Sequence, residues 1–327
     1  MANMAEKTDK KVTLKMVAEK AGVSASSVSL CLNGHPLAER LSAETRKRIF
    51  EASEILSYTP SPLGRALKTG ESRLLGLVIP QLSNSYFSFL AEHILAEAAK
   101  NSYQTLVSTG AGFPQNLPDG IISCIPLPER YSSIPSVYIE PSGQAVQNIL
   151  LHDIEKGMQK TAELFLAKGE KKVWGVFDTA NTKADIFVKV FEKKGLTPIL
   201  LSCCTSSREE RKNTVQFLMK KQYPALVLNG HLTTANFLRH LEKNPHYHPH
   251  LASVCGYWNG ELAHKDLLCV TLTNIPLAAE KAVKLLLDEI KNKNKPDRKK
   301  QLLKVEAAFY YREEFSLIPF TDPEQEQ

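Results

Sequence analysis

Apolar residues near the start of the chain recur at the spacing of an α-helix, in short segments divided by turn residues. Leu14, Val17 and Ala21 lie on one face of the first predicted helix, residues 14–21, with Thr13 as its N-cap. A glycine follows at once, and glycine readily ends a helix. The pattern predicts a short amphipathic helix closed by a tight turn.

Two more helices follow in the same region. Ser24 caps a predicted helix over 25–32 that stops at Asn33, and Ser42 caps a third that runs to about Leu56. Two short helices joined by a glycine turn, with a third behind them, are typical of a helix-turn-helix unit. The second helix is expected to expose Ala25, Ser26, Ser27, Ser29 and Leu30, side chains small enough to let a helix lie deep in the DNA major groove. A plain helical bundle, whose small residues only allow close packing, is the alternative that spacing leaves open.

An ordered series of short motifs in this region resembles the DNA-binding head of the lactose-repressor (LacI/GalR) family. The matching segments are Val12 to Ser24, Val28-Ser29, Leu32-Asn33-Gly34, Ser42 to Arg46, Leu56-Ser57-Tyr58 and Pro60. The resemblance implies sequence-specific binding to double-stranded operator DNA. The DNA-contacting positions that it implies in this region are Thr13, Leu14, Ser24, Ala25, Ser26, Ser27, Ser29, Leu30 and Asn33.

Within that set, the resemblance gives Ala25, Ser26 and Ser27 the contacts to base edges and phosphates, and Ser24 and Ser29 contacts mainly to phosphates. Many relatives carry arginine where this chain has Leu30. Leucine cannot donate a hydrogen bond to guanine, although it can touch a thymine methyl group. The operator sequence therefore cannot be carried over from a relative.

Residues 61–70 match the family's hinge segment, a short helix that orders on DNA and inserts a leucine into the minor groove. Leu67 occupies the wedge position, and Arg65 and Lys68 can reach phosphates. Leu63 completes the set of hinge residues that we assign to DNA binding. A flexible linker is the alternative, because proline and glycine are frequent here.

From Leu74 onward, apolar strands alternate with helices, which predicts parallel sheets of the doubly wound kind. We expect two such lobes, with the chain crossing between them near residues 148 and 275, and the family resemblance implies the same periplasmic-binding-protein-like core. The predicted strands are 74–80, 105–108, 120–125, 137–139 and 172–177, and the predicted helices include 87–99 and 154–166.

The chain between the second and third of these strands is short. Only residues 109–118 precede Asp119, and they include two glycines and two prolines. A parallel crossover normally needs a dozen residues or more. We therefore predict that one helix of the family's N-terminal lobe is missing, which puts the dimer contacts near it in doubt.

The resemblance also implies an effector site between the lobes. Asp153 and Asn229 match polar positions that grip sugars in relatives, but Lys183 stands at the usual arginine and Trp258 at the usual aspartate. The complete set of effector positions that we predict is Asn84, Phe87, Asp153, Lys183, Asn229 and Trp258. Sugar hydroxyls favour planar, bidentate partners. The change indicates either a less polar or aromatic ligand, or a tryptophan that simply fills the cleft.

Composition and the absence of certain motifs narrow the classes of protein to which the chain could belong. The chain has 327 residues and a net charge of +6, which permits an anionic partner. No apolar run approaches the roughly 18 residues of a membrane span, and the polar N-terminus lacks a signal peptide, so we expect a cytoplasmic, nucleoid-associated protein. His246, His248 and His250 alternate in a proline-rich segment, for which a surface loop is favoured over a metal site. No catalytic constellation and no cofactor motif is found, so neither an enzyme nor a cofactor is predicted.

The fold class expected is an all-α helix-turn-helix head followed by an α/β core of two doubly wound parallel-sheet lobes. The predicted divisions are a head at 1–60, a hinge at 61–70, a core at 71–318 and an acidic tail at 319–327. The function expected is a homodimeric transcriptional regulator, with repression favoured, controlled by a small molecule that need not be a simple sugar. A small-molecule-binding module with a vestigial head is the alternative.

Overall fold

The computed structural model describes most of the chain. The described residues are 12–34, 36–59, 70–110, 112–113, 117–140, 148–178, 182–203, 207–256, 258, 262–293 and 300–318. The chain divides into two compact units, residues 1–72 and 73–327, which we call the head and the core. The predicted hinge residues Leu63, Arg65, Leu67 and Lys68 lie outside the described residues.

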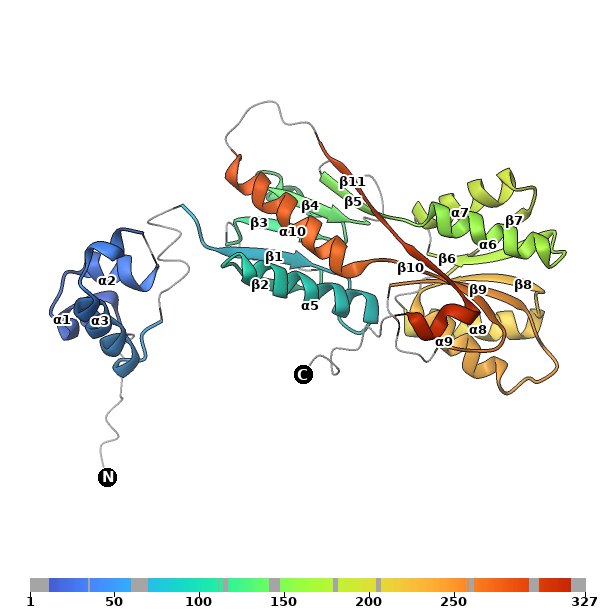
Figure 1. The fold of residues 1–327 in the computed structure, drawn as a ribbon, viewed down its shortest axis with the longest axis horizontal. Coiled ribbons are helices and arrows are strands. Elements are labelled where there is room, and N and C mark those ends of the chain that lie inside the picture. The colour runs from blue at the N-terminus through green and yellow to red at the C-terminus, as the bar shows by residue number, and fades with distance from the viewer. Residues whose placement is uncertain are drawn as a thin grey trace, which may run out of the picture. The chain divides into compact units, whose positions relative to one another are not determined.

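The head is built from short helices that begin at the predicted caps (Figure 1). Its elements are α1 (Leu14–Ala21), α2 (Ala25–Leu32), the 3₁₀ helix η1 (Pro36–Arg40) and α3 (Ala43–Ile55). The hydroxyls of Thr13, Ser24 and Ser42 each accept a hydrogen bond from the backbone amide three residues later, at 3.4, 3.1 and 3.1 Å. Gly22 ends α1 with φ +65°, a conformation that glycine adopts without a steric penalty. The first two helices have the predicted bounds.

A small apolar core holds the three helices of the head together. It consists of Val17, Ala18, Ala21, Val28, Cys31, Ile49 and Ala52. Leu56, at which we expected the third helix to end, follows α3 directly, is half-buried and packs at the margin of this core. The head therefore has one hydrophobic centre, to which each helix contributes.

The core contains two six-stranded sheets, which we call lobe 1 and lobe 2. Lobe 1 has the order β11-β5-β4-β3-β1-β2 and lobe 2 the order β12-β10-β9-β8-β6-β7. Neighbouring strands are parallel throughout, except that β12 pairs antiparallel to β10. The strands are β1 (Leu74–Val78), β2 (Gln104–Ser108), β3 (Gly120–Ser123), β4 (Ser136–Ile139), β5 (Asn148–Asp153), β6 (Lys172–Phe177), β7 (Thr197–Ser202), β8 (Ala225–Asn229), β9 (His250–Cys255), β10 (Leu267–Leu272), β11 (Leu302–Glu306) and β12 (Ala308–Tyr311). The predicted fold class is confirmed.

Helices cover the sheets of both lobes (Figure 1). Lobe 1 packs against α5 (Ser85–Lys100) and α10 (Ile275–Lys291), which lie side by side over the apolar face formed by Leu75, Leu77 and Ile79. Lobe 2 carries α6 (Glu155–Ala167), α7 (Thr182–Lys193), α8 (Arg208–Lys221), α9 (His231–Leu241) and the 3₁₀ helix η3 (Arg312–Leu317).

The chain crosses between the lobes three times. The first crossing follows β5 and therefore lies at Ile154 rather than near residue 148, because residues 148–153 still pair within lobe 1. The second lies just before α10, as predicted, and the third separates β11 from β12 at Ala307. Sequence analysis did not predict this third crossing.

No helix is found among the described residues between β2 and β3. Phe113 instead packs against Gly76 of β1, and the 3₁₀ helix η2 (Glu129–Tyr131) lies nearby. The Tyr131 hydroxyl donates to the Phe113 carbonyl and accepts from the Phe113 amide, both at 2.7 Å. An aromatic pair thus covers part of a sheet face that a crossover helix would otherwise cover.

Candidate functional site

The head presents the first turn of α2 to solvent. Ser24, Ala25 and Ser26 are exposed, and Ser27 is half-buried because its amide and hydroxyl both bond to the Ser24 hydroxyl. Val28 points into the apolar core of the head and fixes the helix from behind. The residues that we assigned to base and phosphate contact therefore lie together on one accessible helix end.

The other predicted DNA-contacting residues of the head are mostly less exposed to solvent than this helix end. Leu14, Ser29, Leu30 and Asn33 are half-buried, whereas Thr13 is exposed at the start of α1. The Asn33 side chain donates to the Ser29 carbonyl at 2.7 Å and so closes the C-terminus of α2.

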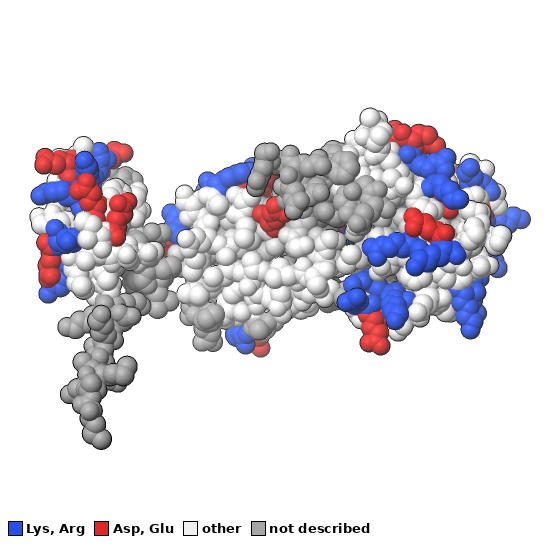
Figure 2. All heavy atoms as spheres, turned by 90° about the horizontal axis from the view of Figure 1, so that it is seen from below, with Lys and Arg blue, Asp and Glu red and all other residues white. Residues whose placement is uncertain are grey.

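Charge on the helical part of the head is nearly balanced. Residues 12–59 include six lysines or arginines and five acidic residues, a net charge of +1. Both signs are visible on the face of the head in Figure 2.

A buried ion pair joins the two lobes of the core. The Lys183 ammonium, from the first turn of α7 in lobe 2, lies 2.5 Å from a carboxylate oxygen of Glu140, which follows β4 in lobe 1. Lys183 is only 7% exposed, so its charge is shielded from water. Such a pair is strongly coupled, since removing either member leaves an uncompensated charge in a dry site.

Two further residues of lobe 1 complete this cluster. The His152 amide donates to the second Glu140 oxygen at 3.1 Å, and the His152 ring nitrogen Nε2 lies 3.0 Å from the Tyr86 hydroxyl. The Lys183 ammonium also lies 5.6 Å from the centre of the Tyr86 ring, within cation–π range. We call Tyr86, Glu140, His152 and Lys183 the interlobe cluster.

Burial and charge shift the pKa values within the interlobe cluster. Burial lowers the pKa of His152 to about 4, although the nearby Glu140 carboxylate acts in the opposite direction. Burial alone would raise the pKa of Glu140, but the Lys183 ammonium and the His152 group hold it below its usual value. Burial, followed by the Glu140 charge, raises the pKa of Tyr86 well above its usual range. At neutral pH the cluster therefore holds one cation, one anion, a neutral imidazole and a neutral phenol.

The predicted effector residues make contacts in different parts of the core. Asn84 caps α5 by accepting from the Tyr86 amide at 3.0 Å, and the Phe87 ring packs edge-on against Tyr86 at 5.1 Å. Asp153 accepts from the Glu155 amide at 3.2 Å and lies 3.7 Å from the Lys304 ammonium. Only Lys183 of the predicted set belongs to the interlobe cluster.

Two other predicted effector residues are buried in lobe 2. Asn229 ends β8, and Trp258 is 1% exposed in the lobe 2 core, with its ring 5.0 Å from that of Phe315. This packing favours the interpretation in which the tryptophan fills space over the one in which it stacks on a ligand.

Three members of the interlobe cluster, Tyr86, Glu140 and His152, were not among the residues predicted from the sequence. A signal was present: Glu140 directly follows a buried strand, and His152 interrupts the apolar run of the next one. Ligands of open parallel sheets bind outside the carboxyl ends of the strands, so polar residues at those ends are candidates.

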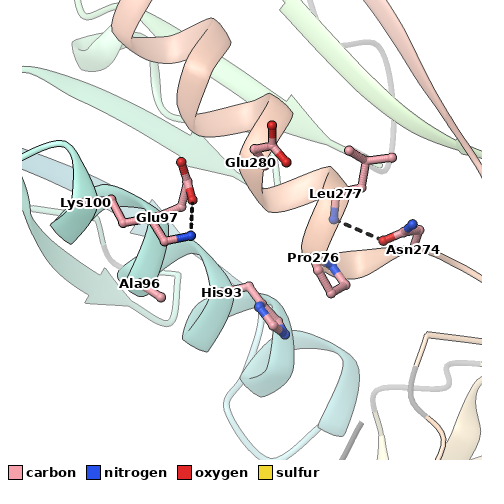
Figure 3. Close-up of a pocket in the computed structure, with 8 residues that line it drawn as sticks. All are labelled: His93, Ala96, Glu97, Lys100, Asn274, Pro276, Leu277 and Glu280. Atoms are coloured by element: carbon pink, nitrogen blue, oxygen red, sulfur yellow. Dashed lines mark hydrogen bonds and ion pairs between the residues drawn. The ribbon is translucent and has the colours of Figure 1, made fainter. Parts of the chain in front are cut away.

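An open groove also lies on lobe 1, between α5 and α10 (Figure 3). Its volume is about 340 Å³, and its walls are formed by His93, Ala96, Glu97, Lys100, Asn274, Pro276, Leu277 and Glu280. The charge of Glu97 is balanced by Lys100 at 3.0 Å on the same helix.

Two of the three histidines considered as metal ligands pair with carboxylates. His248 lies 3.1 Å from Asp266, and His250 lies 2.7 Å from Glu170. In the described part of the chain, no three His, Cys, Asp or Glu side chains gather in a way that could hold a metal ion. Within the same part, no helix has the length and apolar character to span a membrane.

Matches to known proteins agree with this architecture. Residues 13–61 match the family described as "Bacterial regulatory proteins, lacI family". The ribose operon repressor of Lactococcus lactis subsp. lactis is 30% identical over 176 residues, which cover 49% of this chain and 52% of that protein. Catabolite control protein A of Streptococcus mutans serotype c is 34% identical over 102 residues, which cover 31% and 30%. The matched part thus spans from a third to about half of these relatives' lengths.

Solved structures extend the likeness to the fold of nearly the whole chain. A lac repressor dimer bound to operator and the anti-inducer ONPF superposes with a TM-score of 0.72 over 92% of this chain and 98% of that one, at 17% identity. A helix-turn-helix head on a core of two parallel-sheet lobes is therefore the class of protein that the fold defines. The likeness in sequence to the lacI family of bacterial regulatory proteins covers residues 13–61, and the solved structures extend it in fold alone.

Proposed function

We propose that this protein is a sequence-specific DNA-binding transcriptional regulator, with repression as its favoured action. The observation that carries the proposal is the exposed first turn of α2 inside a head that matches the lacI family over residues 13–61. Ala25 and Ser26 then read base edges, while Ser24 and Ser29 hold phosphates. The relatives named above support this function, since one is a ribose operon repressor and one structural neighbour is a lac repressor bound to its operator.

A homodimer on a near-palindromic site belongs to the same proposal, because one short head covers only half a site. Lobe 1 offers a suitable surface: Leu82, Leu95 and Val107 are between 38 and 54% exposed. Figure 2 shows a largely uncharged face on this lobe, whereas basic side chains gather over lobe 2. The lac repressor neighbour is a dimer, which supports the proposal by analogy.

The effector in this proposal is a small molecule that binds between the lobes and is not a simple hexose or pentose. Lys183 is already paired with Glu140, so a neutral hydroxyl that displaced either group would leave a buried charge uncompensated. The proposed hinge at 61–70, with Leu67 as its wedge, transmits lobe closure to the head. Such a regulator acts in the cytoplasm, where the DNA is.

The test of DNA recognition is selection of the full chain against a random duplex library. An enriched, roughly symmetric motif is expected, and affinity should fall with salt at a logarithmic slope of about −0.9 for each phosphate contact. A library that returns no motif would contradict the proposal and favour a ligand-binding module with a vestigial head.

A matched pair of variants locates the DNA-binding surface. Ala25→Glu places a negative charge on the exposed first turn of α2, and Ile55→Glu places the same charge on an exposed position of α3. We expect Ala25→Glu to weaken binding to the selected site at least about tenfold, by phosphate repulsion and by crowding in the groove. Ile55→Glu should bind within about twofold of the parent chain.

A further inference from the structure

Lobe 1 holds the side chains that surround the Lys183 ammonium. Glu140 is fixed in place, because one of its carboxylate oxygens accepts from the His152 amide and its side chain is only 12% exposed. The Tyr86 ring presents its π system to the same ammonium. A carboxylate combined with an aromatic ring is the chemistry that selects an organic ammonium ion.

The ammonium comes from the other lobe. Lys183 stands at the start of α7, and its four-carbon chain carries the charge across to Glu140. Lysine is a flexible side chain with a compact cation, so it can leave such a site when the lobes separate. The three surrounding residues, by contrast, all lie on lobe 1 and stay together.

The cluster also contains a polar atom without a partner. His152 is 2% exposed, and its ring nitrogen Nδ1 makes no hydrogen bond, whereas Nε2 meets the Tyr86 hydroxyl. If Nε2–H donates to the Tyr86 oxygen, Nδ1 is an acceptor for one further N–H group. Buried polar atoms of this kind are uncommon in folded proteins, and each one calls for an explanation, such as a bound group that is absent from the structure.

We propose that Tyr86, Glu140 and His152 form a receptor for a primary ammonium group, that Lys183 fills this receptor as an internal ligand, and that the effector carries a primary ammonium which takes its place. This inference rests on the proposed function for the role of the effector. It adds the chemical class of the effector, which is a small amine. It also adds a mechanism of regulation, in which Lys183 holds the lobes together until an amine displaces it.

The effector must make other contacts to the protein besides those of its ammonium group, because it competes with a lysine that is tethered to the chain. An internal ligand acts at a high effective concentration, so a bare alkylammonium ion competes poorly in the parent chain. Removing the lysine side chain should instead leave a receptor that a free amine can fill. The missing part of Lys183 in a Lys183→Ala variant is a propylammonium group, which names the probe.

The experiment is chemical rescue of thermal stability in the full chain, without DNA. We expect Lys183→Ala to lower the melting temperature of the core by at least about 4 °C, because the Glu140 carboxylate loses its partner. Addition of n-propylammonium chloride at about 50 mM should restore at least half of that loss in the variant and change the parent chain little. Equal concentrations of 1-propanol and potassium chloride serve as controls for volume and for salt.

Rescue that needs Glu140 completes the test. A Glu140→Gln change in the Lys183→Ala background should reduce the effect of n-propylammonium at least about tenfold in apparent affinity, since the carboxylate is the main recognition group. Rescue by 1-propanol to the same extent, or no rescue by the ammonium, would overturn the receptor. Neither outcome depends on DNA, so the proposed function stands or falls separately in the duplex selection.

A second variant covers the case in which Lys183→Ala does not fold. Lys183→Met keeps most of the side-chain volume but removes the charge. A receptor for the ammonium requires that Glu140→Gln destabilise the parent chain and be neutral or stabilising in the Lys183→Met background. The same loss of melting temperature in both backgrounds would show that Glu140 and Lys183 do not act as a pair.

Discussion

Each α-helix of the head begins at a hydroxyl that bonds to the amide three residues away. The interlobe cluster instead draws its members from α5, from the residue after β4, from β5 and from α7. The bonds of the head are exposed, and water can replace any one of them. The charges of the interlobe cluster are buried, so no solvent can replace a lost partner. Local sequence therefore determines the site in the head, and the tertiary fold determines the site in the core.

The two regions also store their stability differently. The head depends on one small apolar core, while its surface residues remain free to vary for DNA recognition. The interlobe cluster gains little net stability from its ion pair, but it imposes a large penalty when one member is removed. This favours a role for the cluster in selecting a conformation of the lobes over a role in holding the fold together.

The largest effect is expected from Ile49→Ala, which should unfold the head and leave the core intact. Ile49 is fully buried, and such truncations cost about 2–5 kcal/mol, comparable to the whole stability of so small a unit. Calorimetry should then lose the transition of the head, and DNA binding should disappear. Ile55→Ala, at a position that is 68% exposed, is the matched control and should change neither. Loss of the core transition in Ile49→Ala would show that the two units are not independent.

Much of the fold could be predicted because its signals are local. Thr13, Ser24 and Gly22 mark helix ends through bonds to near neighbours and through backbone conformation, so the bounds of α1 and α2 were predicted to the residue. Five of the six strands from 74 to 177 were found from their apolar runs, with ends that shifted by up to two residues, as at Ile79 and Cys124, whereas β5 was not predicted. The missing helix before Asp119 followed from the short length of the segment and from its glycines and prolines.

The interlobe cluster could not be predicted in the same way. Lys183 was identified only by its family position, and its partner Glu140 carries no local mark apart from its place after a strand. The ion pair forms because two lobes bring α7 and β4 together, and that contact is set by the packing of the whole core. The third crossing at Ala307 was missed for a similar reason, since one residue separates two short strands of different sheets.

Acid should weaken the core. The pKa of His152 is about 4 in the folded chain and near 6.5 when unfolded, so the unfolded chain binds more protons between these values. Stability is therefore fully present above about pH 6.5 and falls by up to about 3 kcal/mol as the pH approaches 4. The lowered pKa of Glu140 acts in the same direction below its unfolded value. Urea unfolding of the core transition from pH 7 to pH 4.5 measures this slope.

A His152→Gln variant is the control for the acid effect. Glutamine can still bond to the Tyr86 hydroxyl but does not titrate, so the slope between pH 6.5 and pH 4.5 should become markedly shallower. An unchanged slope in this variant would assign the acid sensitivity of the core to other groups.

Tyr131 in lobe 1 lies between the two extremes, because it is buried like the interlobe cluster but carries no charge. Tyr131→Phe removes the hydroxyl that bonds to both the amide and the carbonyl of Phe113. We expect a loss of about 2 kcal/mol in the core transition, since two buried backbone groups lose their partner. Urea unfolding at pH 7 gives the value. A change below about 0.5 kcal/mol would mean that the loop over Gly76 reaches water once the hydroxyl is gone.

The smallest effects are expected from changes at two serines of the same helix end, Ser24 and Ser26. Comparing them separates the stability of the head from its recognition of DNA. Ser24→Ala removes the cap of α2 and should lower the free energy of unfolding of the head by about 1 kcal/mol. Ser26→Ala changes an exposed position and should leave that free energy within about 0.5 kcal/mol of the parent value. DNA binding should respond differently, because both serines are assigned to the DNA-contacting surface. Each variant should weaken binding to the selected duplex, and Ser26→Ala should do so without any loss of folded head. Thermal unfolding and binding titrations on the same samples give both quantities. A Ser26→Ala chain that binds the duplex as tightly as the parent would remove Ser26 from the recognition surface and leave base reading to Ala25 and Ser27.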